Sequence, residues 1–291
     1  MDEPLSYLSI VFSVNNRGYG GDFIGRTQAC IDNLFKLSAK VGLDADITFV
    51  EWNPPADKPR VSQALNWQYK TLPVRFIEIP EAIHNLVPNP RNTTFWEMWA
   101  KNIGIRRATG DFVLSANPDN IYSEALIARL KHLESGVFYR IDSHDTRDGK
   151  VFQVHRAIES LVLRDEVWKP NGSPGFVKPD ANGKFQYPPP IGYVEPLHFN
   201  KSGDFFLMAR DQWHLMHGHP ETDYTVTTDG ETVYLAAAHG WRQVVLPETT
   251  YHLHHDRDER HCPPWSDAVP HGRKNGPNWG FAGRDFHTYS I

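Results

Sequence analysis

The chain has 291 residues and a mass of 33.3 kDa. Hydrophobic residues make up 40% of it and charged residues 22%, a composition that indicates a globular protein and excludes a disordered, collagen-like or coiled-coil chain. With a net charge of −5, no broad basic surface for nucleic acid is expected. No apolar run approaches the roughly 18 residues of a membrane-spanning helix, so no transmembrane segment is expected either.

The N-terminus, MDEPLSYLSIVF, is acidic and lacks the basic region of a signal peptide. Cys30 and Cys262 are the only cysteines, which is too few for a disulfide framework. We therefore expect a cytoplasmic protein. The sequence leaves its oligomeric state open.

Strand and helix signals alternate along the first half of the chain. Short apolar runs predict strands at 7–14, 47–52, 74–79, 112–116 and 137–141. Apolar periodicity predicts helices at 26–41, ended by Gly42, at 93–109, and after the capping residue Ser123. In the second of these helices, Gly104 would allow a close approach to its neighbours. This order of elements predicts an α/β fold with a mostly parallel central sheet flanked by helices.

The second half is less regular. Lys169–Gly192 is rich in Gly and Pro and is expected to be a long loop, which could act as a lid. Beyond it, strands are predicted at 204–208 and 241–246, and helices at 210–217 and 230–239. From Arg257 onward no regular structure is expected.

Polar residues follow three of the predicted parallel strands, where ligands bind in such sheets. Asp119, with the Asn117 amide as auxiliary, suits Mg²⁺ or Mn²⁺, although Asn and Asp also cap their own turns. Glu51 could accept a hydrogen bond from a nucleobase, or it could simply end a strand. Asn15 and Asn53 lie at the same predicted edge.

Further candidates lie in the second half. A carboxylate at a helix N-terminus, Asp229, is either a cap or a general base, with Glu231 as the second choice for the base. His252 or His255 could complete the coordination of a cation, or be an ordinary surface histidine. Asp204 could reach donor hydroxyls. 

A tryptophan completes the set of candidates. Trp213 could stack on a sugar ring or belong to the core, and the core is the simpler interpretation.

Read in order, several segments resemble the GT-A-type nucleotide-sugar glycosyltransferases: SVNNRGYGG, VEWNPP, AKNIGIRRATGDFVLSANPDN, FYRIDSHD, SGDFFLMARDQWHLMHGHPE and YHLHHD. They are most similar to a glycosyltransferase-like group that shares VEWNPP and AKNIGIRRA…NPD. The resemblance runs from about residue 7 to 255. It implies a GT-A fold with a smaller antiparallel part near the acceptor side, a nucleotide-sugar donor, and Mn²⁺ or Mg²⁺.

The resemblance also implies roles for individual residues. Asn117-Pro118-Asp119 matches the Asp-x-Asp metal motif, with Asn in place of the first Asp, which removes one charge from the site. Glu51 matches the residue that holds the base or ribose, Asn102 matches an Asn in the helix before the metal strand, and Asp229 matches the base of inverting relatives.

These observations together predict a metal-assisted glycosyltransferase that uses a UDP-sugar and a hydroxyl acceptor such as a glycan, as a single domain over 1–291. Residues 1–141 would bind the donor, 193–256 would serve the acceptor and catalysis, and 257–291 would form an irregular tail. The donor contacts would be Val14, Asn15, Arg26, Glu51, Asn53, Asn102 and Asn117. Inversion is favoured, but a retaining enzyme would share these features. Nucleotidyl transfer, for which Arg17 and Arg26 could hold a triphosphate, and sugar or nucleotide binding without turnover stay open as alternatives.

Overall fold

The structure is a computed structural model, and the residues that it describes are 6–90, 92–148, 150–155, 166–168, 174–176, 197–198, 201–223, 228–256 and 274–291. Of the expected loop Lys169–Gly192, only 174–176 lie within these ranges, as strand β9 (Pro174–Phe176) paired with β8 (Glu166–Trp168). The rest of that predicted loop, and 257–273 of the predicted tail, lie outside the described residues.

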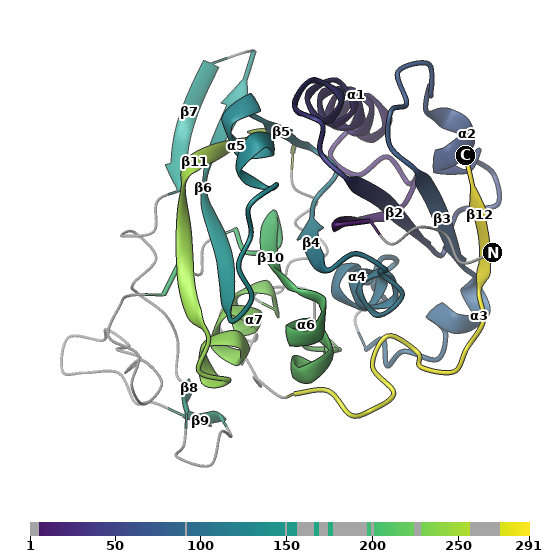
Figure 1. The fold of residues 1–291 in the computed structure, drawn as a ribbon. Coiled ribbons are helices and arrows are strands. Elements are labelled where there is room, and N and C mark those ends of the chain that lie inside the picture. Colours follow the sequence, from purple (N-terminus) through teal and green to yellow (C-terminus); the bar gives the residue numbers. More distant parts are fainter. Residues whose placement is uncertain are drawn as a thin grey trace.

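A single sheet contains strands from residue 8 to residue 290, in the order β12-β3-β2-β1-β4-β10-β6-β11-β5, with β7 beside β6 (Figure 1). Its core is parallel, in the order β3-β2-β1-β4. These core strands closely match the predicted ones: β1 (Leu8–Val14), β2 (Ala45–Trp52), β3 (Val74–Ile79) and β4 (Phe112–Ala116). The expected α/β architecture with a parallel core is therefore confirmed.

The sheet continues from β4 through strands of mixed direction. Strand β10 is antiparallel to β4 and β6, and β11 runs parallel to β6 and antiparallel to β5. The bounds of these strands are β5 (Asn120–Tyr122), β6 (Val137–Arg147), β7 (Lys150–His155), β10 (Phe205–Ala209) and β11 (Arg242–Leu253). At the opposite edge, β12 (His287–Ser290) pairs antiparallel with β3. The predicted irregular tail is thus wrong for this segment, which the sheet edge holds in a strand.

Helices cover both faces of the sheet, because the parallel strands are apolar on both sides. On one face, Ile10 and Phe12 of β1 belong to the same core cluster as the apolar side chains of α1 and α5. On the other face, Val11 packs in a cluster with residues of α4, α6 and α7. Figure 1 shows α1 and α4 on opposite sides of the parallel strands. The helices are α1 (Phe23–Val41), α2 (Val61–Ala64), α3 (Glu81–His84), α4 (Glu97–Arg106), α5 (Glu124–Arg129), α6 (Arg210–Met216) and α7 (Thr228–Ala238).

Several predicted helix signals are confirmed. Gly42 ends α1 in the left-handed conformation at φ 64°, and Ser123 caps α5 by accepting a hydrogen bond from the Leu126 N–H. A Cβ at Gly104 would lie 2.5 Å from Cγ1 of Val11, so α4 does approach the sheet closely at this point. Among the described residues, no helix combines the length and apolarity needed to cross a membrane.

Two strands and one helix show why observed bounds depart from predicted ones. Strand β11 passes Pro247 through a break in register between Leu246 and Thr249, whereas the prediction ended the strand before the proline. Strand β6 runs on to Arg147, where β7 and β11 flank it. Helix α4 begins only at Glu97, after a turn in which the Asn89 side chain bonds the backbone of Thr93.

Candidate functional site

The candidate site lies at the carboxyl ends of β1 and β4. The order of the parallel strands reverses here, because β2 follows β1 on one side while β4 lies on the other. The loops that leave adjacent strands at such a point run in opposite directions and leave room for a ligand. The chain continues from β4 through Asn117 and Asp119 into β5.

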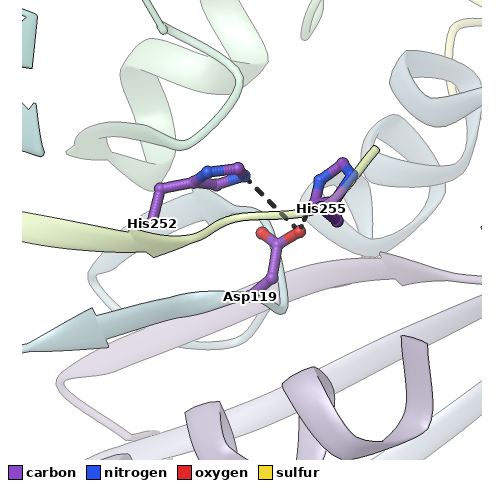
Figure 2. A group of neighbouring side chains, drawn as sticks. All are labelled: Asp119, His252 and His255. Carbon is purple, nitrogen blue, oxygen red and sulfur yellow. Dashed lines mark ion pairs between the residues drawn. The ribbon is translucent and has the colours of Figure 1, made fainter. Parts of the chain in front are cut away.

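Three side chains converge at this edge: Asp119, His252 and His255. Oδ2 of Asp119 lies 3.6 Å from Nε2 of His252 and 3.3 Å from Nε2 of His255. One ligand atom from each residue lies within 4.8 Å of the others. Figure 2 shows both rings directed toward the same carboxylate. The structure therefore brings together all three residues that the sequence predicts as metal ligands.

Strand pairing explains this convergence. The short strand β5 follows Asp119 and pairs with the distal part of β11, so that Asn120 lies opposite His252. The N–H of Leu253 also donates to the carbonyl of Asp119 at 2.9 Å. The turn after β4 is thereby fixed against the end of β11, and His255 follows two residues beyond this bond.

The electrostatics of the group favour an ionised carboxylate. Burial opposes the ionisation of Asp119, but hydrogen bonds and charge from the two histidines outweigh it and hold the pKa of the carboxyl well below its usual range. Burial likewise disfavours a charged His252, yet Asp119 and Asp145 raise the pKa of its ring to about 10. Metal binding at Nε2 would displace the proton from that nitrogen.

The donor set fits a divalent cation. It offers one carboxylate and two imidazoles, a combination that Mn²⁺ accepts and that the harder Mg²⁺ accepts less readily. Oδ1 of Asp119 is buried and accepts no hydrogen bond from the described residues, so it has capacity for a ligand. The group has no further cysteine or carboxylate ligand among the described residues.

The loop between β1 and α1 packs against the His255 ring. Arg26 is buried, and its guanidinium donates to the carbonyls of Tyr19 (2.7 Å) and Gly20 (2.9 Å). Its Nε lies 4.0 Å from Oδ2 of Asp119. A Cβ at Gly20 would lie only 2.5 Å from the His255 ring. Arg26, predicted as a donor contact, therefore links this loop to Asp119.

The ends of β1 and β2 carry the predicted nucleoside contacts. Val14 and Glu51 are register partners, and the Asn15 side chain donates to the carbonyls of Trp52 and Asn53. Asn53 turns the chain with a φ of 45°. These residues are brought together at one edge of the sheet, as the sequence predicts, while their contact with a nucleotide stays a prediction.

Glu51 is fully buried, with its Oε1 accepting the N–H of Val61 at the start of α2. Burial raises the pKa of this carboxyl to about 7, while the Val61 N–H and Arg60 lower it and Glu78 raises it further. Oε2 has no hydrogen-bond partner among the described residues. A carboxyl of this kind can offer either a donor or an acceptor to a ligand near neutral pH.

A cavity of about 400 Å³ lies beside β3 and β12. Pro54, Arg60, Glu78 and Phe286 are among its walls, so it adjoins the loop after β2. The cluster around Asp119 does not line it.

Asn117 is committed to protein contacts on both sides of its amide. Its oxygen accepts from Nζ of Lys101 at 2.6 Å, and its nitrogen donates to Oδ1 of Asp204 at 2.9 Å. Asn117 is thus held between Lys101 and Asp204, and its auxiliary role at a metal stays a prediction. Oδ2 of Asp204, which has no hydrogen-bond partner among the described residues, lies 3.6 Å from Nζ of Lys201.

The predicted base, Asp229, lies in the first turn of α7 and belongs to the same polar network. Its Oδ2 accepts from the N–H of Gly203 at 2.9 Å and from Oγ of Ser202 at 3.1 Å. The carbonyl of Gly203 in turn accepts from Lys101, which also bonds Asn117. Glu231 is buried in the same helix.

Two predicted contacts lie away from this edge. Asn102 is fully buried in α4, where its amide bonds the backbone of His219 and the carboxylate of Glu221. Trp213 is also fully buried, and its Nε1 donates to the carbonyl of Val113. The Asn102 amide is bonded on both sides within the protein and the Trp213 ring packs inside the core, so the described contacts of both are structural, and their roles toward a donor or a sugar stay predictions.

Other functional candidates have no clear signal in the sequence. Asp145 of β6 lies 3.1 Å from Nδ1 of His252 and also pairs with Lys201. Lys101 is fully buried within α4 and joins the loops of Asn117 and Gly203. The partners of both residues are distant in sequence, so only their charge could have drawn attention to them.

Comparison with known proteins gives a likeness of fold. No protein-family model matches the chain, and no curated protein matches its sequence. Among solved structures, the catalytic domain of Drosophila beta1,4-galactosyltransferase 7, solved with xylobiose, aligns with a TM-score of 0.45 at 12% identity, covering 92% of this chain and 80% of that one. 

Two further solved glycosyltransferases align with the chain. Galactosyltransferase LgtC, solved with donor and acceptor sugar analogues, aligns with a TM-score of 0.41 at 11% identity, covering 88% of this chain and 87% of that one. Glycosyltransferase GlyE of Streptococcus pneumoniae TIGR4 aligns with a TM-score of 0.33 at 14% identity, covering 70% of this chain but 34% of GlyE.

Proposed function

We propose that the protein is a glycosyltransferase that moves a sugar from a nucleotide-diphosphate donor, most simply a UDP-sugar, to a hydroxyl of a glycan or another acceptor. The observation that carries this proposal is the convergence of Asp119, His252 and His255 at the point where the parallel strands reverse order. A cation site at such a point suits a ligand that carries a diphosphate.

Asp119, His252 and His255 would hold the cation, Mn²⁺ in preference to Mg²⁺ because two of the three ligands are imidazoles. When bound, the ion would supply positive charge to the departing diphosphate. Asn15, Glu51 and Asn53 would hold the nucleoside at the ends of β1 and β2.

Asp229 would act as the general base. Gly203 and Ser202 hold its Oδ2 and so fix the carboxylate, while none of the described residues donates a hydrogen bond to Oδ1. Oδ1 would take the proton from the acceptor hydroxyl as its oxygen bonds the anomeric carbon, and the bond from that carbon to the diphosphate breaks. With a single carboxylate and direct attack, the transfer would invert the anomeric centre. Asp204 would face the sugar.

The test combines binding and turnover. We expect UDP to raise the thermal midpoint of the protein only when Mn²⁺ is present, because a ligand that binds the native state stabilises it. Asp119→Asn should abolish this Mn²⁺-dependent rise. Asp229→Asn should keep it but lower sugar transfer or donor hydrolysis by at least ~100-fold, as expected for loss of a general base. Asp111→Asn, at an exposed aspartate just before β4, is the matched control and should change neither measurement.

Three results would contradict the proposal in different ways. Pyrophosphate release from a nucleoside triphosphate would indicate nucleotidyl transfer. Binding of sugar nucleotides without turnover, in the wild type and across donor sugars, would indicate a binding protein. No stabilisation by any nucleotide with or without Mn²⁺ would refute the donor site itself.

A further inference from the structure

Strand β6 places a carboxylate behind one of the proposed metal ligands. Asp145 and His252 are register partners on the parallel strands β6 and β11, so their side chains leave the sheet side by side. Nδ1 of His252 has no hydrogen bond among the described residues, but it forms an ion-pair contact of 3.1 Å with Oδ1 of Asp145, while Nε2 of the same ring lies 3.6 Å from Oδ2 of Asp119. The imidazole is thus held between two carboxylates, with one nitrogen toward each.

The ring of His255 has the same orientation relative to Asp119. Nδ1 of His255 lies 3.0 Å from the carbonyl of Asp256, and its Nε2 faces Asp119 at 3.3 Å. In both rings, therefore, Nδ1 is next to an oxygen acceptor and Nε2 points to Asp119. A histidine that binds a metal through one nitrogen needs an acceptor for the N–H on the other, and that acceptor sets the tautomer and the ring orientation.

Water can hardly take the place of the Asp145 carboxylate beside His252. Asp145 is 8% exposed, and the His252 side chain is 14% exposed, so water has little access to replace the carboxylate. Lys201 pairs with Asp145 and lies 3.6 Å from Oδ2 of Asp204, and it compensates the charge of both carboxylates. Lys201 keeps this place with a backbone φ of 50°, a conformation unusual for a residue other than glycine.

We propose that Asp145 is a positioning residue, whose carboxylate beside Nδ1 holds the His252 ring with Nε2 directed toward the cation held with Asp119. This inference rests on the proposed function, since it assumes that the Asp119 group binds a divalent cation. Strand β6 supplies none of the three ligands, yet through Asp145 it would influence the affinity of the site for the cation.

The test measures Mn²⁺ affinity by titration calorimetry on the full chain, together with the Mn²⁺ electron-spin-echo signal from directly bound imidazole nitrogens. Asp145→Ala should weaken Mn²⁺ binding by about 10–100-fold, the range seen when such an outer partner is removed. It should also remove or weaken one of two nitrogen couplings. Asp142→Ala, a partly exposed aspartate of the same strand, is the matched control and should keep the wild-type affinity and both couplings.

Asp145→Asn serves if the alanine variant does not fold. Its amide oxygen can still accept from Nδ1 but carries no charge, so we expect affinity between those of the wild type and Asp145→Ala. Wild-type affinity with both couplings in either folded variant would overturn the inference. If the wild type itself binds no Mn²⁺, the metal part of the proposed function fails first, so the two failures can be told apart.

Discussion

The buried carboxyl of Glu51 should make the stability of this protein depend on pH in a predictable direction. In the folded protein burial raises the pKa of Glu51 from 4.5 to about 7, against the opposing effects of the Val61 N–H and Arg60. The folded state therefore holds this proton more tightly than the unfolded chain. The stabilisation from Glu51 is complete below about pH 4.5 and is lost as the pH rises to about 7.

The size of the effect follows from the same values. A rise from 4.5 to about 7 corresponds to about 3 kcal/mol, at about 1.4 kcal/mol for each pKa unit. Glu51→Gln keeps an oxygen that can accept from Val61 and removes the ionisation. The free energy of unfolding of the variant relative to the wild type should therefore increase by about 3 kcal/mol between pH 4.5 and pH 8.

Urea unfolding of both proteins at several pH values, followed by circular dichroism and tryptophan fluorescence, measures this difference. The other titrating groups are common to both proteins, so their contributions cancel. A difference in unfolding free energy that stays constant from pH 4.5 to pH 8 would show that Glu51 ionises in the folded protein as it does in water, and would refute the reasoning.

Two further predictions concern glycines. Gly20→Ala should weaken Mn²⁺ binding, because its Cβ would lie 2.5 Å from the His255 ring, whereas Gly21→Ala, also at positive φ but with open space around it, should cost only stability, about 1 kcal/mol. Equal Mn²⁺ affinities in a calorimetric titration of the two variants would contradict this. Gly104→Ala should lower the unfolding free energy by about 1–3 kcal/mol, because the new methyl group would lie against Val11, although alanine normally stabilises a helix. A more stable variant in urea would refute the close approach.

The parallel core and its helices were predictable because their signals are local. Apolar runs identified β1 to β4, and the caps Ser123 and Gly42 identified helix ends. Strand β12 was missed, since HTYS carries no apolar alternation and is held by pairing with β3. The C-terminal segment also depends on Arg107, whose guanidinium donates to the carbonyls of Gly280, Phe281 and Arg284.

The candidate site was predictable in part. Asp119, His252 and His255 were identified from residue type and from their place beside strand ends, and the structure groups them. Asn102, predicted as a donor contact, lies in the core, as does Trp213, for which the core was the simpler interpretation. The type of a polar or aromatic residue does not reveal whether its side chain faces the core or a ligand when neighbouring elements cover the helix on every side.

The sequence by itself determined the alternation of strands and helices, the parallel core and the polar residues that follow its strands, because these depend on neighbours along the chain. The tertiary structure alone decided that β11 continues beyond Pro247 and that β5 pairs with it, which places His252 against Asp119. It also decided that Asp145 lies behind that ring. Such contacts join segments far apart in the chain, and their geometry is fixed by strand register and packing, which a linear pattern does not encode.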